Sequence, residues 1–285
     1  MPAKALDDGS QNRVKVPKEI HYIWIGGRIQ DKYRDGILST VRTLRDYRVN
    51  LWLSKAMSFD SGAFAHNRLQ AKQIGAEFMD IDELVAQSYT PTEKWAMALE
   101  WGWRDGDNGG QKPNFGAVSD IIRAVILHVR GGIYIDTDCS VKANLAQFNG
   151  VTPFGFQAAT GNDLNPTGDK LSNCVMISIS SGYFIGYYRQ WINDEYGKIQ
   201  NKGLGPGDLQ RRFRGEHGYS RKHVEEKTLF MTGPTALAAC GIGALTIRGL
   251  DVGAALNGSG AVNDLQGLRI NKDHFKIAYD NTWLE

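Results

Sequence analysis

Residues 119–138, which read SDIIRAVILHVRGGIYIDTD, decide the fold. Apolar residues at helical spacing predict a helix over Phe115–Arg130 that ends at the Gly-Gly pair. A short strand is expected after the glycines, with Asp136 and Asp138 at its end. Because side chains alternate faces along a strand, both carboxylates should point the same way, with Thr137 turned away.

Two carboxylates on one strand face can hold a hard divalent cation. Mg2+ and Mn2+ prefer oxygen ligands and usually take one or two protein carboxylates, with phosphate oxygens or water in the remaining positions. An isolated Asp-x-Asp motif is weak evidence for a metal site, because most copies of it lie in surface turns or helix caps. In open α/β sheets, however, ligands bind beyond the carboxyl ends of strands. Asp136 and Asp138 therefore predict a metal–diphosphate site.

Strands and helices alternate in the first part of the chain, which is typical of a mainly parallel α/β sheet covered on both faces. The expected strands are Glu19–Ile25, Val49–Leu53 and Ala76–Ile81, and the expected helices between them are Asp31–Tyr47 and His66–Ile74. A polar, glycine-rich insertion is expected at 88–114. The later elements are strands near Pro153–Gln157 and Val175–Ile179 and a helix over Tyr183–Ile199.

Composition excludes several classes of protein. The 33 basic and 31 acidic residues leave a formal charge of +2, which gives no argument for nucleic acid as a partner. The three cysteines lack a Cys-x-x-Cys spacing and favour neither a disulfide framework nor a zinc site. No apolar run suits a membrane span or a signal peptide. We predict a flexible segment at 1–15 and one domain at 16–285.

Five motifs carry a family resemblance. They are HYIWIGG at 21–27, Ser119-Asp120-x-x-Arg123, Gly131-Gly132-x-Tyr134-x-Asp136-x-Asp138, Met231-Thr232-Gly233-Pro234 and Asn281-Thr282-Trp283. Together they resemble the sugar-nucleotide-binding region of DXD glycosyltransferases, which have the GT-A fold, and especially the glucosyltransferase domain of large clostridial glucosylating toxins and related bacterial effectors. They occur in the family's order from residue 17 to the C-terminus.

The resemblance implies roles for residues near the donor. Ile23 and Trp24 would bind the nucleotide, with Trp24 stacked on the base. Asp120 and Arg123 would hydrogen-bond the hydroxyls of the donor sugar. The residues themselves leave alternatives open: Trp24 could pack in the core, and the other two could form a surface ion pair at i, i+3 spacing.

Further roles follow from the same resemblance. Tyr134, Thr137 and Asn173 would contact the sugar nucleotide. Asn281 would join the Asp pair as a metal ligand, with Asp280 or water as the alternatives for this position, and Trp283 would close over the diphosphate. Sheet packing for Tyr134, a turn for Asn173 and a frayed tail remain the competing interpretations.

A basic segment lies downstream, and it predicts either a solvated loop or a surface for an acidic acceptor protein. Its residues are Arg211, Arg212, Arg214, Arg221 and Lys222.

The function that the resemblance implies is a retaining glycosyltransferase that depends on Mn2+ or Mg2+ and uses a UDP-sugar. Asp120, Arg123, Asp136 and Asp138 would be its catalytic residues. We expect glucose or N-acetylglucosamine as the sugar and a host protein side chain as the acceptor. A transferase acting on polysaccharide, glycolipid or metabolite is the alternative, and a nucleotide-sugar binder or Mg2+-dependent phosphatase would be a different class. We expect a soluble monomer without a cleaved signal peptide, in the bacterial cytoplasm or delivered into a host cytosol.

Overall fold

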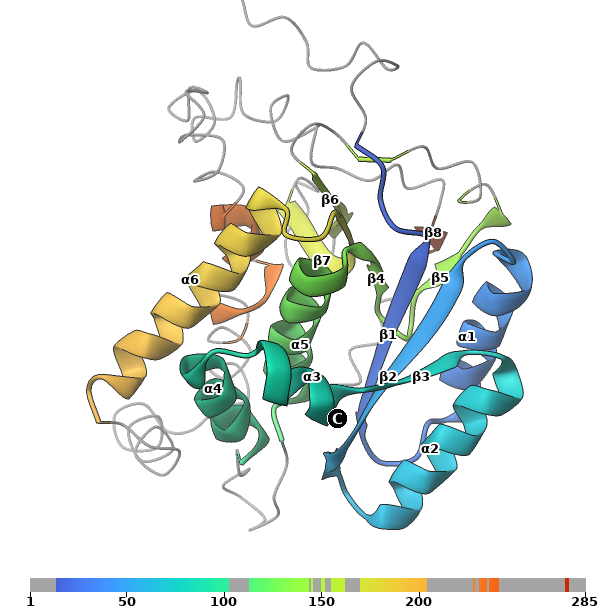
Figure 1. The fold of residues 1–285 in the computed structure, drawn as a ribbon, viewed down its shortest axis with the longest axis horizontal. Coiled ribbons are helices and arrows are strands. Elements are labelled where there is room, and N and C mark those ends of the chain that lie inside the picture. The colour runs from blue at the N-terminus through green and yellow to red at the C-terminus, as the bar shows by residue number, and fades with distance from the viewer. Residues whose placement is uncertain are drawn as a thin grey trace, which may run out of the picture.

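A six-stranded sheet in the order β3-β2-β1-β4-β7-β6 forms the centre of the computed structural model (Figure 1). The structure describes residues 14–102, 113–143, 145, 150–151, 155–161, 170–203, 228, 231–234, 236–240 and 275–276. The parallel strands are β1 (Glu19–Gly26), β2 (Arg48–Ser58), β3 (Glu77–Asp80) and β4 (Gly132–Ile135). The antiparallel strands are β6 (Phe156–Gly161) and β7 (Lys170–Ser178). The predicted mainly parallel α/β sheet is confirmed, with an antiparallel edge.

Helices cover both faces of this sheet (Figure 1). On one side lie α1 (Asp31–Thr43) and α2 (Ser61–Ile74). On the other side lie α3 (Ile81–Ser88), α4 (Pro91–Trp101), α5 (Phe115–Arg130) and α6 (Tyr183–Gln200). Each side has its own hydrophobic cluster, so the domain has three layers. A small antiparallel pair, β5 (Ser140–Val141) with β8 (Phe275–Lys276), lies outside the main sheet.

The bounds of α5 are those predicted, because its apolar stripe is long and its end is a glycine pair. The polar insertion is a correction: residues 91–101 form α4, which buries Ala96, Met97 and Leu99. A capping box between Thr90 and Glu93 starts this helix. The glycine-rich sequence that follows this helix led to the prediction of a polar insertion over the whole segment, although the capping box is a local helix signal.

Two glycines let α5 turn directly into β4. Gly131 and Gly132 have φ values of +69° and +94°. A Cβ at Gly131 would lie 2.5 Å from the backbone nitrogen of Ser180, and one at Gly132 would lie 2.7 Å from the carbonyl oxygen of Glu19. No larger residue fits either position, so these glycines fix how the helix presents its side chains to the strand end.

His21 joins the strands on either side of β1 and is fully buried. Its Nε2 lies 3.0 Å from the Gly131 carbonyl oxygen, and its Nδ1 accepts the indole N–H of Trp52 at 3.1 Å. Burial lowers the pKa of His21 to about 4, so the ring is neutral and Nε2 carries the donated proton. This histidine of the first motif is a structural residue.

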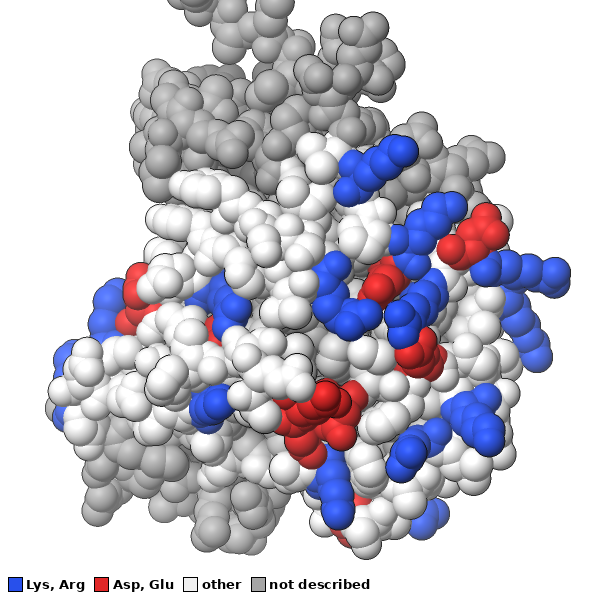
Figure 2. All heavy atoms as spheres, in the orientation of Figure 1, with Lys and Arg blue, Asp and Glu red and all other residues white. Residues whose placement is uncertain are grey.

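Val14 is the first described residue, and an antiparallel bridge pairs it with Val151. Residues 1–13 lie outside the described part, so the flexible segment at 1–15 stays a prediction. On the face drawn in Figure 2, acidic side chains are interspersed among the basic ones. Among the described helices, none is both long and apolar enough to cross a membrane.

Candidate active site

The predicted site residues gather where the parallel strands β1 and β4 end. His21 of β1 pairs with Tyr134 of β4. Ile23 and Asp136 therefore follow this pair by two residues each, at the same carboxyl edge of the sheet. Ligands bind at this edge in open α/β folds.

The Asp pair lies in a turn, which corrects the prediction of a shared strand face. β4 ends at Ile135, and the backbone N–H of Cys139 closes the turn by donating to the Asp136 carbonyl oxygen at 2.9 Å. The chain turns here because it leaves the main sheet to form β5. Asp136 keeps a side chain that is 30% exposed. Thr137 lies in the turn, close to α1. A Cβ atom added to Gly36 of α1 would lie 3.7 Å from the backbone carbonyl oxygen of Thr137.

Arg123 joins the helix to the turn. Its Nη2 lies 3.1 Å from Asp120 Oδ1, and its Nη1 lies 3.2 Å from Asp136 Oδ1. Its guanidinium also lies 4.3 Å from the centre of the Tyr134 ring. The side chains of Arg123 and Asp120 are only 5% and 6% exposed, so the surface ion pair is excluded. A buried charge pair with this many partners is held in one geometry.

Asn173 and Tyr134 complete this network. The side-chain amide of Asn173 donates to Asp120 Oδ1 at 2.8 Å, and the backbone carbonyl oxygen of Asn173 accepts from Arg123 Nη1 at 2.7 Å. The Tyr134 hydroxyl donates to Asp136 Oδ1 at 2.5 Å. Asn173 lies within β7, so the turn interpretation is wrong for this residue. Four predicted site residues thus surround Arg123.

Burial controls the charges in this network. It raises the pKa of Asp120 to about 7, although Arg123, Thr232 and Asn173 oppose the shift. Burial also raises the pKa of Asp136, against the effect of Arg123 and Tyr134. Desolvation lowers the pKa of Arg123, but attraction to Asp136 and its other neighbours outweighs it and raises the pKa overall. The guanidinium therefore stays charged.

Trp24 and Ile23 lie on opposite faces of β1. Ile23 is buried on the α5 side, together with Tyr134. Trp24 is partly buried on the α1 side, where its ring is 5.2 Å from that of Tyr33 and its Nε1 donates to the Gly27 carbonyl oxygen at 2.8 Å. Part of its indole therefore holds the turn after β1, and base stacking by Trp24 stays a prediction.

Two hydroxyl residues in the network were not assigned roles from the sequence. Ser119 Oγ accepts from Arg123 Nη2 at 2.7 Å, and Thr232 Oγ1 donates to Asp120 Oδ2 at 2.9 Å. Both belong to motifs that carried the resemblance. Their membership in these motifs was therefore the signal in the sequence that could have identified them as site residues.

The metal prediction rests on Asp136 and Asp138. The part of the chain described by the structure has no cluster of three or more histidine, cysteine or acidic side chains suited to a metal. Mg2+ and Mn2+ need only one or two carboxylates, so the oxygen donors of this turn fit such an ion. Asn281, Trp283 and the basic segment at 211–222 lie outside the described residues.

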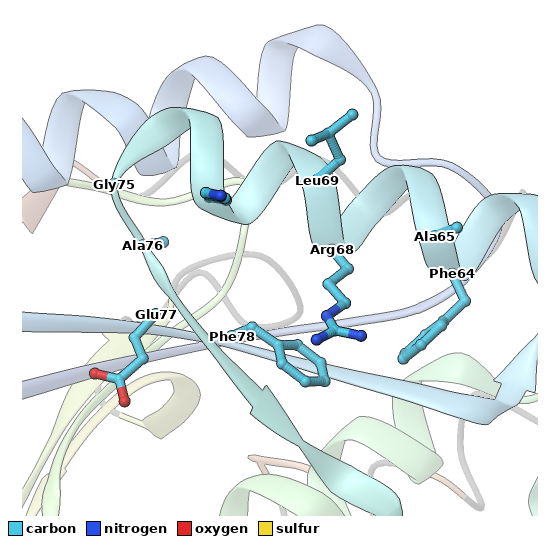
Figure 3. Close-up of a pocket in the computed structure, with 9 residues that line it drawn as sticks. Phe64, Ala65, Arg68, Leu69, Gly75, Ala76, Glu77 and Phe78 are labelled. Atoms are coloured by element: carbon cyan, nitrogen blue, oxygen red, sulfur yellow. The ribbon is translucent and has the colours of Figure 1, made fainter.

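A groove between α2 and β3 lies apart from this site (Figure 3). In it the Arg68 guanidinium lies 5.1 Å from the centre of the Phe78 ring. Two strands separate β3 from β4, so the groove does not reach Asp136. Its lining residues are Phe64, Ala65, Arg68, Leu69, Lys72, Gly75, Ala76, Glu77 and Phe78.

Comparison with known sequences points to one family. Residues 31–155 match the model of the glycosyltransferase sugar-binding region containing a DXD motif. One relative, subversion of eukaryotic traffic protein A of Legionella pneumophila, is 28% identical over 147 residues. The match covers 50% of this chain and 20% of that protein, so the chain spans a small part of its relative.

Solved structures show the same fold at low identity. The catalytic domain of alpha-toxin from Clostridium novyi superposes with a TM-score of 0.65 at 12% identity, over 95% of this chain and 80% of that one. The UDP-bound glycosyltransferase domain from the YGT toxin gives 0.53 at 14% identity, over 93% and 81%. Residues 31–155 thus match the DXD-containing sugar-binding region of glycosyltransferases, and the chain shares its GT-A fold with glycosyltransferase domains of known structure.

Proposed function

We propose that this chain is a glycosyltransferase that moves glucose or N-acetylglucosamine from a UDP-sugar to a side chain of a host protein, with retention at the anomeric carbon. The observation that carries the proposal is Arg123, buried between Asp120 and Asp136 at the carboxyl edge of the sheet. Burying charged groups costs free energy, and buried charged groups with shifted pKa values cluster at functional sites. Recognition of sugar hydroxyls is a function that fits the donors and acceptors of this network.

In this proposal the network binds the donor sugar. Asp120 offers carboxylate oxygens, while Arg123 and Asn173 offer N–H donors, and all three are held by their mutual bonds. Sugar hydroxyls both donate and accept, so they pair with such a mixed set. Groups fixed before the donor arrives lose little entropy on binding it.

Asp136 and Asp138 would hold Mn2+ or Mg2+ at the turn, with Asn281 as a further ligand and Trp283 over the diphosphate. When bound, the cation would neutralise charge that grows on the leaving diphosphate. Tyr134 and Arg123 bind Oδ1 of Asp136, which fixes the rotation of this carboxylate. Thr137, in the same turn, and Ile23 and Trp24, on β1, would contact the nucleotide.

Two similar proteins support the donor and the setting. The glycosyltransferase domain from the YGT toxin, which has a similar fold, binds UDP, and the Legionella relative is named for subversion of eukaryotic traffic. Both fit a protein that acts on host components, which favours a host protein side chain as the acceptor.

The first experiment measures hydrolysis of UDP- and GDP-sugars by the purified chain with Mn2+, with Mg2+ and with EDTA. We expect UDP release from one UDP-sugar that stops in EDTA and in the Asp138→Ala variant. Hydrolysis that continues in EDTA would contradict the metal mechanism. Release of inorganic phosphate would identify a phosphatase, and UDP binding without turnover would identify a binder.

The acceptor needs a second experiment. The chain, the preferred UDP-sugar and a host cell lysate are incubated together, and peptides are searched for the mass of one added hexose or N-acetylhexosamine. A modified protein side chain that is absent with Asp138→Ala supports the proposal. Label that enters only polysaccharide, glycolipid or small molecules would replace the protein acceptor with the alternative.

A further inference from the structure

Asp120 receives its bonds from three different parts of the chain. Asn173 of β7 donates a hydrogen bond to Oδ1, and Arg123 of α5 forms an ion pair with the same oxygen at 3.1 Å. Thr232 donates to Oδ2 at 2.9 Å, across a sequence separation of 112 residues. In the described part of the chain, Thr232 is the one donor recorded for Oδ2. The rotation of this carboxylate therefore depends on a hydroxyl from a distant segment.

Thr232 is itself held firmly and is fully buried. Its backbone N–H donates to the Thr228 carbonyl oxygen at 3.0 Å, and its own carbonyl oxygen accepts the Tyr188 hydroxyl of α6. Thr228 in turn accepts from Asn114 at 2.9 Å, and Asn114 caps the first turn of α5. Thr228 contacts the N-cap residue of α5, and Thr232 contacts Asp120 within the same helix.

The hydroxyl of Thr232 has one proton and two acceptors within reach. One is Asp120 Oδ2 and the other is the Thr228 carbonyl oxygen at 3.2 Å. A buried carboxylate oxygen without a hydrogen-bond donor costs free energy. The Thr232 hydroxyl therefore donates its proton to Oδ2 when Asp120 is ionised. That bond holds one carboxylate oxygen and leaves the other with Asn173 and Arg123.

We infer that Thr232 is a positioning residue that sets the orientation of Asp120 for the donor sugar. This inference rests on the proposed function and deepens it. Thr232 acts through Asp120, so its hydroxyl should affect the sugar and leave the nucleotide alone. Loss of the hydroxyl should lower kcat for donor hydrolysis while the affinity for UDP, which has no sugar, stays the same.

The experiment compares Thr232→Val, which keeps the shape and loses the hydroxyl, with Thr232→Ser, which keeps the hydroxyl. Both are measured for UDP affinity by calorimetry, for kcat and KM with the UDP-sugar, and for Tm. We expect kcat of the valine variant to fall by about tenfold or more, the effect of one lost bond to a charged group, with unchanged UDP affinity. The serine variant should recover most of the wild-type rate.

Thr40→Val is the matched control. Thr40 is also fully buried, and its hydroxyl lies 2.7 Å from that of Tyr22 on the α1 side of the sheet. This variant should lose thermal stability and keep its turnover. If Thr232→Val does not fold, Thr232→Ala, which brings no extra bulk, takes its place with the same expected result.

Three results would overturn the inference. They are wild-type turnover in the valine or alanine variant, equal losses in the valine and serine variants, or a loss of UDP affinity parallel to the loss of kcat. If the wild-type protein hydrolyses no donor, both the proposed function and this inference are wrong. If the wild-type protein hydrolyses the donor and Thr232→Val is equally active, only the inference is wrong.

Discussion

Arg123 Nη1 lies 3.2 Å from Asp136 Oδ1, so a guanidinium flanks the first carboxylate of the DXD turn. The pKa of Arg123 is raised, because attraction to Asp136 and its other acidic neighbours outweighs the burial that lowers it. A divalent cation that binds this turn therefore meets a fixed positive charge nearby.

Arg123→Gln should tighten the binding of Mn2+ in the absence of nucleotide by about tenfold, because like charges near one site repel. The same variant should lose donor turnover, since the guanidinium also belongs to the proposed sugar-binding network. Electron paramagnetic resonance of free Mn2+ measures the affinity. Arg123→Lys keeps the charge and is the control. Equal Mn2+ affinity in all three proteins would show that the guanidinium does not influence the metal site.

Asp138→Ala should lower turnover by roughly a hundredfold, the scale on which one group that stabilises transition-state charge acts. Its side chain is only partly buried, so Tm without ligand should stay near that of the wild type. Asp35→Ala, which removes an exposed carboxylate from α1, is the matched control and should remain active. A fully active Asp138→Ala would mean that this residue is not a metal ligand.

Two separable contributions are expected of Trp24. Trp24→Phe keeps an aromatic face but loses the indole bond to Gly27, so it should cost about 1 kcal/mol of unfolding free energy with little change in UDP affinity. Trp24→Ala removes the face too and should weaken UDP binding by roughly ten- to a hundredfold. Calorimetry with UDP and thermal unfolding measure the two effects. Unchanged UDP affinity in Trp24→Ala, with a large fall in Tm, would identify a core residue that packs on Tyr33.

The pKa of Asp120, raised by burial from 3.8 to about 7, predicts a pH dependence of stability. Between these values the folded state binds more protons than the unfolded state, so stability from this group is lost as the pH rises towards 7. Asp120→Asn does not titrate there. The difference in Tm, variant minus wild type, should therefore grow from pH 5 to pH 8.

This measurement is made in EDTA, so that no metal alters the charge of the turn. Asp46→Asn, which changes an exposed acid at the opposite end of the sheet, is the control and is measured under the same conditions. A flat difference for Asp120→Asn would show that this carboxyl titrates alike in the folded and unfolded chain.

Local signals in the sequence accounted for much of the fold and part of the site. Helix α5 was predicted with its observed bounds, because its apolar stripe and terminal glycines act within a few residues of one another. The motif around Asp120 and Arg123 was also sufficient to suggest a pair that acts together, since residues three apart share one helix face. The strand ending near Asp136 followed from the same local reasoning.

Only the tertiary structure decided the environment of these residues. Spacing alone favoured a surface pair for Asp120 and Arg123, and burial between α5, β7 and Thr232 made them a network. The turn that carries Asp138 follows from the departure of the chain to β5. Thr232 reaches Asp120 from 112 residues away. Periodicity reports only which face of an element is apolar, whereas these contacts arise from how separate layers pack against each other.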